Sequence, residues 1–180
     1  MDIEIINYAG TERIEQIAKA YKEHADDLPK ISEKDRISFR SMINKQFSQL
    51  SLVRGITFDF PLTDPYKYET IDELLPDFQN NLIRVNSSGN DSQLWGPVYN
   101  LMFRAIHDWI HVKNLLDFNY ADELIAFWEQ IKFSKLFPSL RFDFDLYAKC
   151  LRSEIIYQAA YKEYYGEFHV PIQTIVLEDL

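Results

Sequence analysis

The sequence predicts a mainly α, single-domain protein, an irregular helical bundle with a minor two-stranded β ribbon. Apolar residues recur at helical spacing over most of the chain. Two short segments follow a strand pattern instead, and they are bounded by turn residues. The chain has 180 residues, of which 47% are hydrophobic. This is enough for one core without a disulfide or a metal, at roughly 100–200 residues per domain.

The predicted helices each have a start or stop signal in the sequence. Thr11, Ser32 and Thr70 are suited to N-cap positions, Pro97 to a first helical turn and Gly166 to a C-terminal stop. With these signals we expect helices over residues 11–25, 32–52, 70–78, 97–116, 122–136 and 140–165.

The two predicted strands lie between the second and fourth helices. Residues 55–60 alternate apolar and polar side chains until Pro61, and Leu82 to Val85 form the second short run. We expect the strands to pair, because an unpaired strand leaves its backbone groups unsatisfied. The predicted organisation is a helical pair (1–54), a strand and loop insertion (55–92), core helices (93–166) and a docked apolar tail (167–180).

Charge and composition exclude several classes of function. The net charge of −9 argues against a nucleic-acid partner, because phosphates would be repelled. The sequence lacks an apolar run of about 20 residues, so we expect no membrane span. An acidic start and a single cysteine, Cys150, favour a reducing cytoplasm over secretion. A small-molecule ligand and a homo-oligomer remain open.

His107 and His111 are the residues most suited to chemistry. Four residues apart on a predicted helix, their rings lie on one face and can share one divalent metal, zinc or iron. A third ligand is needed, and Glu154, flanked by apolar residues in the longest predicted helix, is the candidate. Two histidines and one carboxylate form the ligand set of non-haem iron sites and several zinc hydrolases.

Neighbouring polar residues complete the predicted site. Asp108 is the candidate catalytic base, although it also has the spacing to orient a histidine ring or to pair with Arg104. Arg104 and Gln158 are assigned to supporting or ligand-binding roles. The function predicted from these residues is that of a metal-dependent hydrolase or oxidoreductase.

Two alternatives stand beside the metal site. The same His, Asp, Arg and Glu side chains are suited to a buried structural network in a non-enzymatic protein that acts through oligomerisation or a protein partner. A pocket lined by Tyr and Trp, with Arg104 facing an anionic ligand, is the other alternative. The sequence leaves open whether the protein is an enzyme.

Several short segments also occur in an order that resembles one group of proteins. They are Phe58 with Asp64-Pro65-Tyr66, Leu94-Trp95, Asn100 to Asp108, His111, Asp117-Phe118, and Ser153-Glu154 with Gln158. Over about residues 58–175 the chain resembles uncharacterised helical proteins of bacteria and phage genomes. Members of that group show a Phe-Arg-x-x-His-Asp segment, a second His, a Phe-x-x-x-Gly-Glu segment and a Glu-x-x-x-Gln segment.

The resemblance implies one site and no reaction, because the group has no established activity. The site it implies comprises Arg104, His107, Asp108, His111, Glu154 and Gln158. The chain departs from the group twice. Its second His follows the first by four residues, where some relatives have five, and Tyr120-Ala121-Asp122-Glu123 stands where Gly-Glu is expected.

Overall fold

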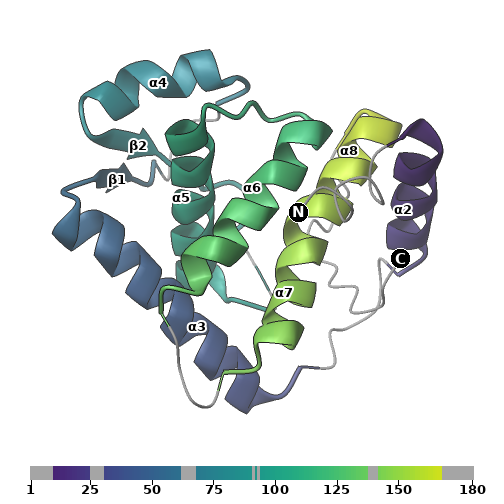
Figure 1. Cartoon of the computed structure of the whole chain (residues 1–180), viewed down its shortest axis with the longest axis horizontal. Helices are drawn as coiled ribbons and strands as arrows, with labels where there is room; N and C mark the ends of the chain where they lie inside the picture. The colour runs from purple at the N-terminus through teal and green to yellow at the C-terminus, as the bar shows by residue number, and fades with distance from the viewer. Residues whose placement is uncertain are drawn as a thin grey trace.

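The computed structural model describes residues 10–24, 31–61, 68–90, 92, 94–137 and 142–167. It is mainly α with one small sheet, which confirms the predicted fold class (Figure 1). In chain order the elements are α2 (Thr11–Glu23), α3 (Glu33–Ser48), η1 (Gln49–Val53), β1 (Thr57–Asp59), α4 (Ile71–Gln79), β2 (Leu82–Arg84), α5 (Pro97–Asn114), α6 (Tyr120–Ser134), α7 (Phe144–Arg152), η2 (Ser153–Tyr157) and α8 (Gln158–Tyr165). The predicted tail lies almost wholly outside the described residues.

Capping chemistry sets several of the helix boundaries. Ser32 caps α3, since its hydroxyl oxygen accepts a hydrogen bond from the Asp35 backbone N–H at 3.2 Å. Thr11 is the first residue of α2, and Gly10 occupies the N-cap position predicted for it. Asn119 caps α6 by accepting from the Asp122 N–H, so this helix begins two residues before the predicted start.

The two strands pair in parallel, with Phe58 opposite Ile83. Parallel pairing follows from the connection, because α4 carries the chain back to the starting edge between β1 and β2. This unit occupies one corner of the molecule, beside α5 (Figure 1). The predicted strand pair is therefore present, and its crossover helix makes it a small β-α-β unit.

The long helix predicted over 140–165 is a run of three segments, α7, η2 and α8, that ends at Gly166 with φ 79°. The middle segment, η2, is a π-helical turn, which contains one more residue per turn than an α-helix. Glu154 lies in η2, and Gln158 begins α8. The predicted stop at Gly166 is confirmed, because glycine adopts this left-handed conformation without strain.

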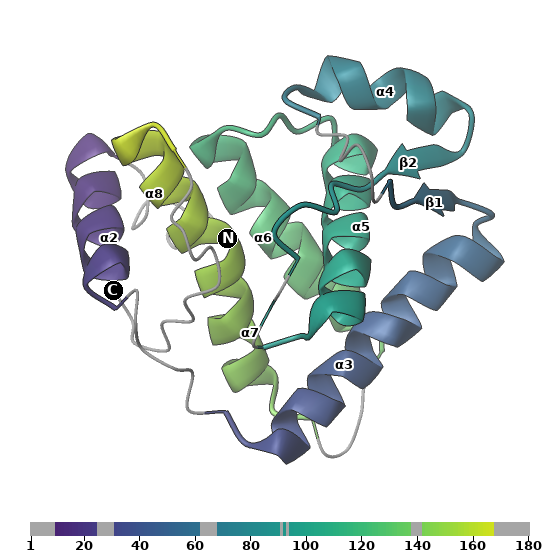
Figure 2. The same cartoon turned by 180° about the vertical axis from the view of Figure 1, so that it is seen from behind.

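The core is built around α5, which contacts α3, α4 and α6. Trp95, just before α5, and Trp109, within it, are both buried. On the side of the molecule away from β1 and β2, α8 packs against α2 (Figure 2). The segment η2 packs against α6. In the part of the chain that the structure describes, no helix is both long and apolar enough to cross a membrane.

Candidate metal centre

One side of α5 carries two rows of polar side chains. Asn100, Arg104 and Asp108 are spaced by four residues, and Arg104, His107 and His111 by three and four, so the two rows project from neighbouring parts of the helix surface. The His111 side chain is fully buried, and the His107 side chain is 15% exposed. The predicted pairing of the two rings is thus present, with ring centroids 4.5 Å apart.

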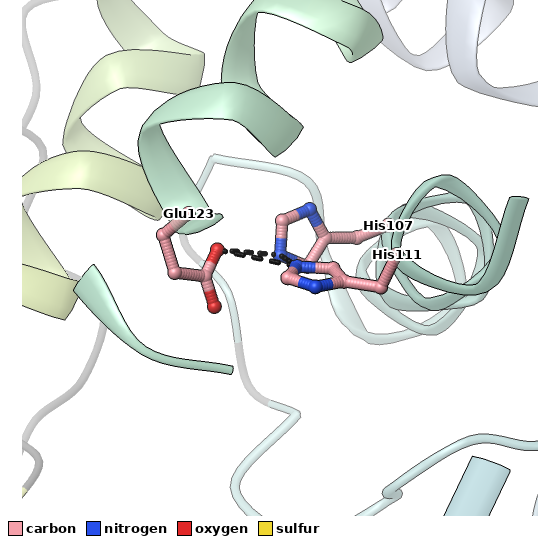
Figure 3. Close-up of side chains that lie close together, drawn as sticks. All are labelled: His107, His111 and Glu123. Carbon is pink, nitrogen blue, oxygen red and sulfur yellow. Dashed lines mark hydrogen bonds and ion pairs between the residues drawn. The ribbon is translucent and has the colours of Figure 1, made fainter. Parts of the chain in front are cut away.

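Glu123 completes a three-residue cluster with the two histidines (Figure 3). Its Oε2 lies 3.0 Å from His107 Nε2 and 3.4 Å from His111 Nε2, and the two Nε2 atoms are 3.0 Å apart. Atoms bound to one ion at about 2.1 Å lie about 3.0 Å apart on adjacent octahedral positions and about 3.4 Å apart in a tetrahedron. The three atoms therefore have the spacing of ligands on one ion, and the cluster could hold a metal.

The other nitrogen of each ring faces an oxygen. His111 Nδ1 lies 3.3 Å from the Leu116 carbonyl oxygen, which can only accept, and His107 Nδ1 lies 3.2 Å from Gln130 Oε1. With each Nδ1 donating, both neutral rings keep a lone pair on Nε2. Two lone pairs and a carboxylate oxygen then meet at one point, and this arrangement requires a cation, either a proton or a metal ion.

When a proton holds the cluster, its charges stabilise one another. Burial acts to raise the pKa of Glu123, but the charge of His107 and hydrogen bonds from both rings outweigh it and hold that pKa well below its usual range. Burial acts in the opposite direction on His107, and the neighbouring Glu123 carboxylate still raises the pKa of the imidazole. Glu123 is therefore ionised at neutral pH, as a metal ligand must be.

Glu123 was not among the predicted site residues. It lies in the first turn of α6, which the short segment after α5 brings back beside the two histidines. One sequence signal was available. When the Phe-x-x-x-Gly-Glu segment of the resembling group is placed on Phe118 to Glu123, its glutamate coincides with Glu123. The glycine position is Asp122 in this chain, and this difference hid the match.

A pocket of about 510 Å³ opens beside the cluster, between α5, α6, η2 and α8. His107 and Glu123 line it, and His111 lies behind them. Asp108 also lines the pocket, and burial raises the pKa of its carboxyl to about 6 against the charges of both histidines and of Arg104. The predicted catalytic base thus lies next to the cluster of His107, His111 and Glu123.

Glu154 and Gln158 line the same pocket from η2 and α8. Gln158 Nε2 donates to Glu154 Oε2 at 2.9 Å. Among the described residues, the carboxylate that the structure brings to the two histidines is that of Glu123, and Glu154 lies on another part of the wall. Burial raises the pKa of Glu154 to about 7, although Arg104, Gln158 and Trp95 all act to lower it.

Arg104 binds a loop. Its guanidinium donates to the carbonyl oxygens of Asn86 at 2.8 Å, Ser88 at 2.6 Å and Gly89 at 2.8 Å. Asn86 and Ser88 line the pocket, so Arg104 holds this segment against the opening. Burial also lowers the pKa of the guanidinium, partly offset by Glu154 and Asp108. The donors that were predicted to face a ligand are thus directed at backbone oxygens.

Comparison of the chain with protein-family models, with curated protein sequences and with solved structures found no match.

Proposed function

We propose that the protein is a hydrolase that uses one divalent metal ion held by His107, His111 and Glu123. The observation that carries the proposal is the convergence of three lone-pair atoms at 3.0–3.4 Å, with each imidazole Nδ1 committed to an oxygen. Three protein ligands beside an open pocket are typical of catalytic metal sites, which keep a position for water or substrate. A divalent ion at such a site supplies Lewis acidity and lowers the pKa of bound water.

Asp108 supplies the base. It follows His107 on α5, lines the pocket and lies within electrostatic range of both histidines and Glu123. In the proposed reaction the Asp108 carboxylate takes a proton from the attacking water as the water oxygen bonds to the electrophilic carbon. The bond to the leaving group then breaks, and the proton passes to the leaving group. Two of the proposed metal ligands and the base thus come from α5, and the third ligand comes from α6.

The same ligand set also serves non-haem iron enzymes, and the 3.0 Å separations suit adjacent octahedral positions. Hydrolysis is the first choice because Asp108 gives the site a base beside the ligands. Iron-dependent oxidation is the second candidate. The structural alternative, in which a proton holds the cluster together, predicts a protein that is indifferent to chelators.

Metal content separates these functions. We expect protein purified without a histidine tag to contain or bind about one equivalent of zinc or another divalent ion per chain. EDTA should lower the melting temperature, and the added ion should restore it. Less than about a tenth of an equivalent, with no binding on titration of zinc, cobalt or ferrous ion, would refute the metal centre and favour the structural alternative.

Activity then distinguishes hydrolysis from oxidation. We expect metal-dependent cleavage of an activated ester such as p-nitrophenyl acetate, reduced by about 100-fold in Asp108→Asn while the metal content is unchanged. Equal rates for Asp108→Asn and the unmodified protein would exclude Asp108 as the base. Oxygen consumption by the ferrous form, without any ester cleavage, would support the iron enzyme instead.

A further inference from the structure

We infer that the end of the pocket farthest from His111 binds a carboxamide-type group, in which a carbonyl oxygen and an N–H lie side by side. The inference rests on the proposed function only for the chemistry at the other end of the bound molecule. Two side chains carry it, Asn100 as a donor and Glu154 as an acceptor. Both line the pocket, and neither belongs to the metal-type cluster.

Asn100 offers an unused donor. Its side chain is 2% exposed, and its Nδ2 has no hydrogen-bond partner among the described residues. A buried amide N–H without a partner is destabilising, so a ligand that provides an acceptor gains the full hydrogen bond. The matching ligand group is a carbonyl oxygen.

Glu154 offers an unused acceptor. Gln158 occupies its Oε2, while Oε1 is buried and accepts no hydrogen bond of normal geometry within the described structure. The donor that acts on this carboxyl besides Gln158 is the Trp95 indole N–H, which also lacks a partner of normal geometry there. The matching ligand group for Oε1 is an N–H. Rotation about the terminal side-chain bonds of Asn100 and Glu154 is soft, so each atom can turn toward a ligand in the cavity.

We place the two side chains at the same end of the pocket from the residues near each of them. Asn100 is in the first turn of α5, seven residues before His107, which places it about 10 Å from that histidine along the helix axis. The Glu154 carboxyl is influenced by Arg104, one turn along from Asn100, and by the indole N–H of Trp95, just before α5. A ligand of modest length therefore spans from this pair to the metal centre.

The charges around the pair favour a neutral group over an anion. The nearest guanidinium, that of Arg104, is directed at three backbone carbonyls, so a ligand carboxylate or phosphate would meet Glu154 without it. An amidinium would satisfy Glu154 but would place N–H groups against the Asn100 donor. A carboxamide matches both side chains at once.

Three isosteric probes test this match, namely benzamide, benzoate and benzamidine. Calorimetric titrations at pH 8 use the protein as purified and again after EDTA, so that coordination of benzoate by a metal is recognised. We expect benzamide to bind most tightly, with a Kd of about 1 mM, as suits so small a ligand. Tighter binding of benzoate or benzamidine to the EDTA-treated protein would overturn the inference, as would no binding of any probe below about 10 mM.

Two variants should change the relative affinities for the three probes, one toward the anion and the other toward the cation. Glu154→Gln replaces an acceptor by a donor and should move the benzamide-to-benzoate preference about 10-fold or more toward benzoate. Asn100→Asp replaces a donor by an acceptor and should move preference about 10-fold toward benzamidine. Glu129→Gln and Asn80→Asp make the same exchanges outside the pocket and should leave the ranking unchanged.

The variants also keep this inference separate from the proposed function. Cobalt binding should be unchanged in Asn100→Asp, because Asn100 is two helical turns from His107. If both variants fold, as shown by circular dichroism, and the ranking of the probes is the same as in the unmodified protein, Asn100 and Glu154 do not contact the probes and the inference is wrong. If the unmodified protein does not bind metal, the metal centre is refuted, while the ranking of the three probes still tests the carboxamide site.

Discussion

The two ends of the pocket each hold a largely buried glutamate, and the structure changes their acidity in opposite directions. Glu123 faces two imidazoles, which hold its pKa well below the usual range. Glu154 faces an amide and an indole, with only the charge of Arg104 nearby, and burial raises its pKa to about 7. Burial therefore does not decide the charge of a carboxyl here, because the partners do.

This difference assigns the two carboxyls to different tasks. A metal ligand must be ionised, and the lowered pKa of Glu123 meets that condition at neutral pH. A carboxyl that is close to half protonated at neutral pH is a poor metal ligand but a suitable hydrogen-bonding partner for a polar ligand. Variants of both ends of the pocket test whether Glu123 is the metal ligand and Glu154 the hydrogen-bonding partner, beginning with the largest expected effect.

Glu123→Gln and Glu154→Gln form a matched pair. The Glu123 variant loses an anionic ligand, so we expect cobalt or zinc affinity to fall by more than the roughly 10–100-fold caused by losing an outer partner. The Glu154 variant should bind the same ion within about 3-fold, because Glu154 is not in the cluster. Metal titration followed by visible absorption of the cobalt form measures both. A larger loss in Glu154→Gln than in Glu123→Gln would reverse the assignment.

Gln130 supports the metal end indirectly. Its Oε1 lies 3.2 Å from His107 Nδ1 and fixes which ring nitrogen keeps the lone pair. Gln130→Leu should weaken metal binding by about 10–100-fold without removing any ligand. Thermal unfolding in EDTA serves as the control, since a loss confined to the metal-bound protein separates tautomer control from general damage to the core.

Glu154 should make stability depend on pH. Its pKa is raised from 4.5 to about 7 on folding, so the folded protein binds this proton more tightly than the unfolded chain. The stability it contributes is present below the unfolded pKa and is lost as the pH rises through about 7. Glu154→Gln should therefore be more stable than the unmodified protein at pH 8, by about 1–3 kcal/mol, with a smaller advantage at pH 5.

Urea unfolding at both pH values measures this effect. A Glu154→Gln advantage that is the same at pH 5 and pH 8 would show that the carboxyl does not titrate in this range. A variant less stable at pH 8 than the unmodified protein would show that the carboxylate is favourably paired, contrary to the comparison of the two ends.

Arg104 lies between Asn100 and His107 on α5 and binds the loop of Asn86 to Gly89, which contributes to the pocket lining. Lysine keeps the charge but cannot reach three carbonyl oxygens with one geometry. Arg104→Lys should lower the free energy of local opening at Asn86 to Gly89 by about 1–2 kcal/mol, as measured by amide hydrogen exchange. Arg54→Lys, at a guanidinium stacked on Trp109, is the control and should leave exchange in this loop unchanged. Equal exchange in the two variants would contradict the role of Arg104.

Local patterns in the sequence predicted much of the fold. Ser32, Gly166 and the i, i+4 spacing of His107 and His111 act within one or two helical turns, so their consequences were visible in the chain itself. The third member of the cluster depends on how α6 returns beside α5, which is a tertiary property. Glu154 was the reasonable candidate because it is flanked by apolar residues. That pattern is shared by a metal ligand and by a residue elsewhere on the pocket wall, and Glu154 lies on the pocket wall.

The π-helical turn η2 also changes the direction in which the following side chains face within one continuous helix. A π turn is equivalent to one inserted residue, and deleting a residue there would rotate everything that follows by about 100° relative to what precedes it. At present α7 keeps its own buried face, while α8 presents Tyr161 to Tyr21 of α2. The π turn thus sets which residues of α8 face α2, independently of which residues of α7 are buried. Glu154 lies in this turn, between the two segments.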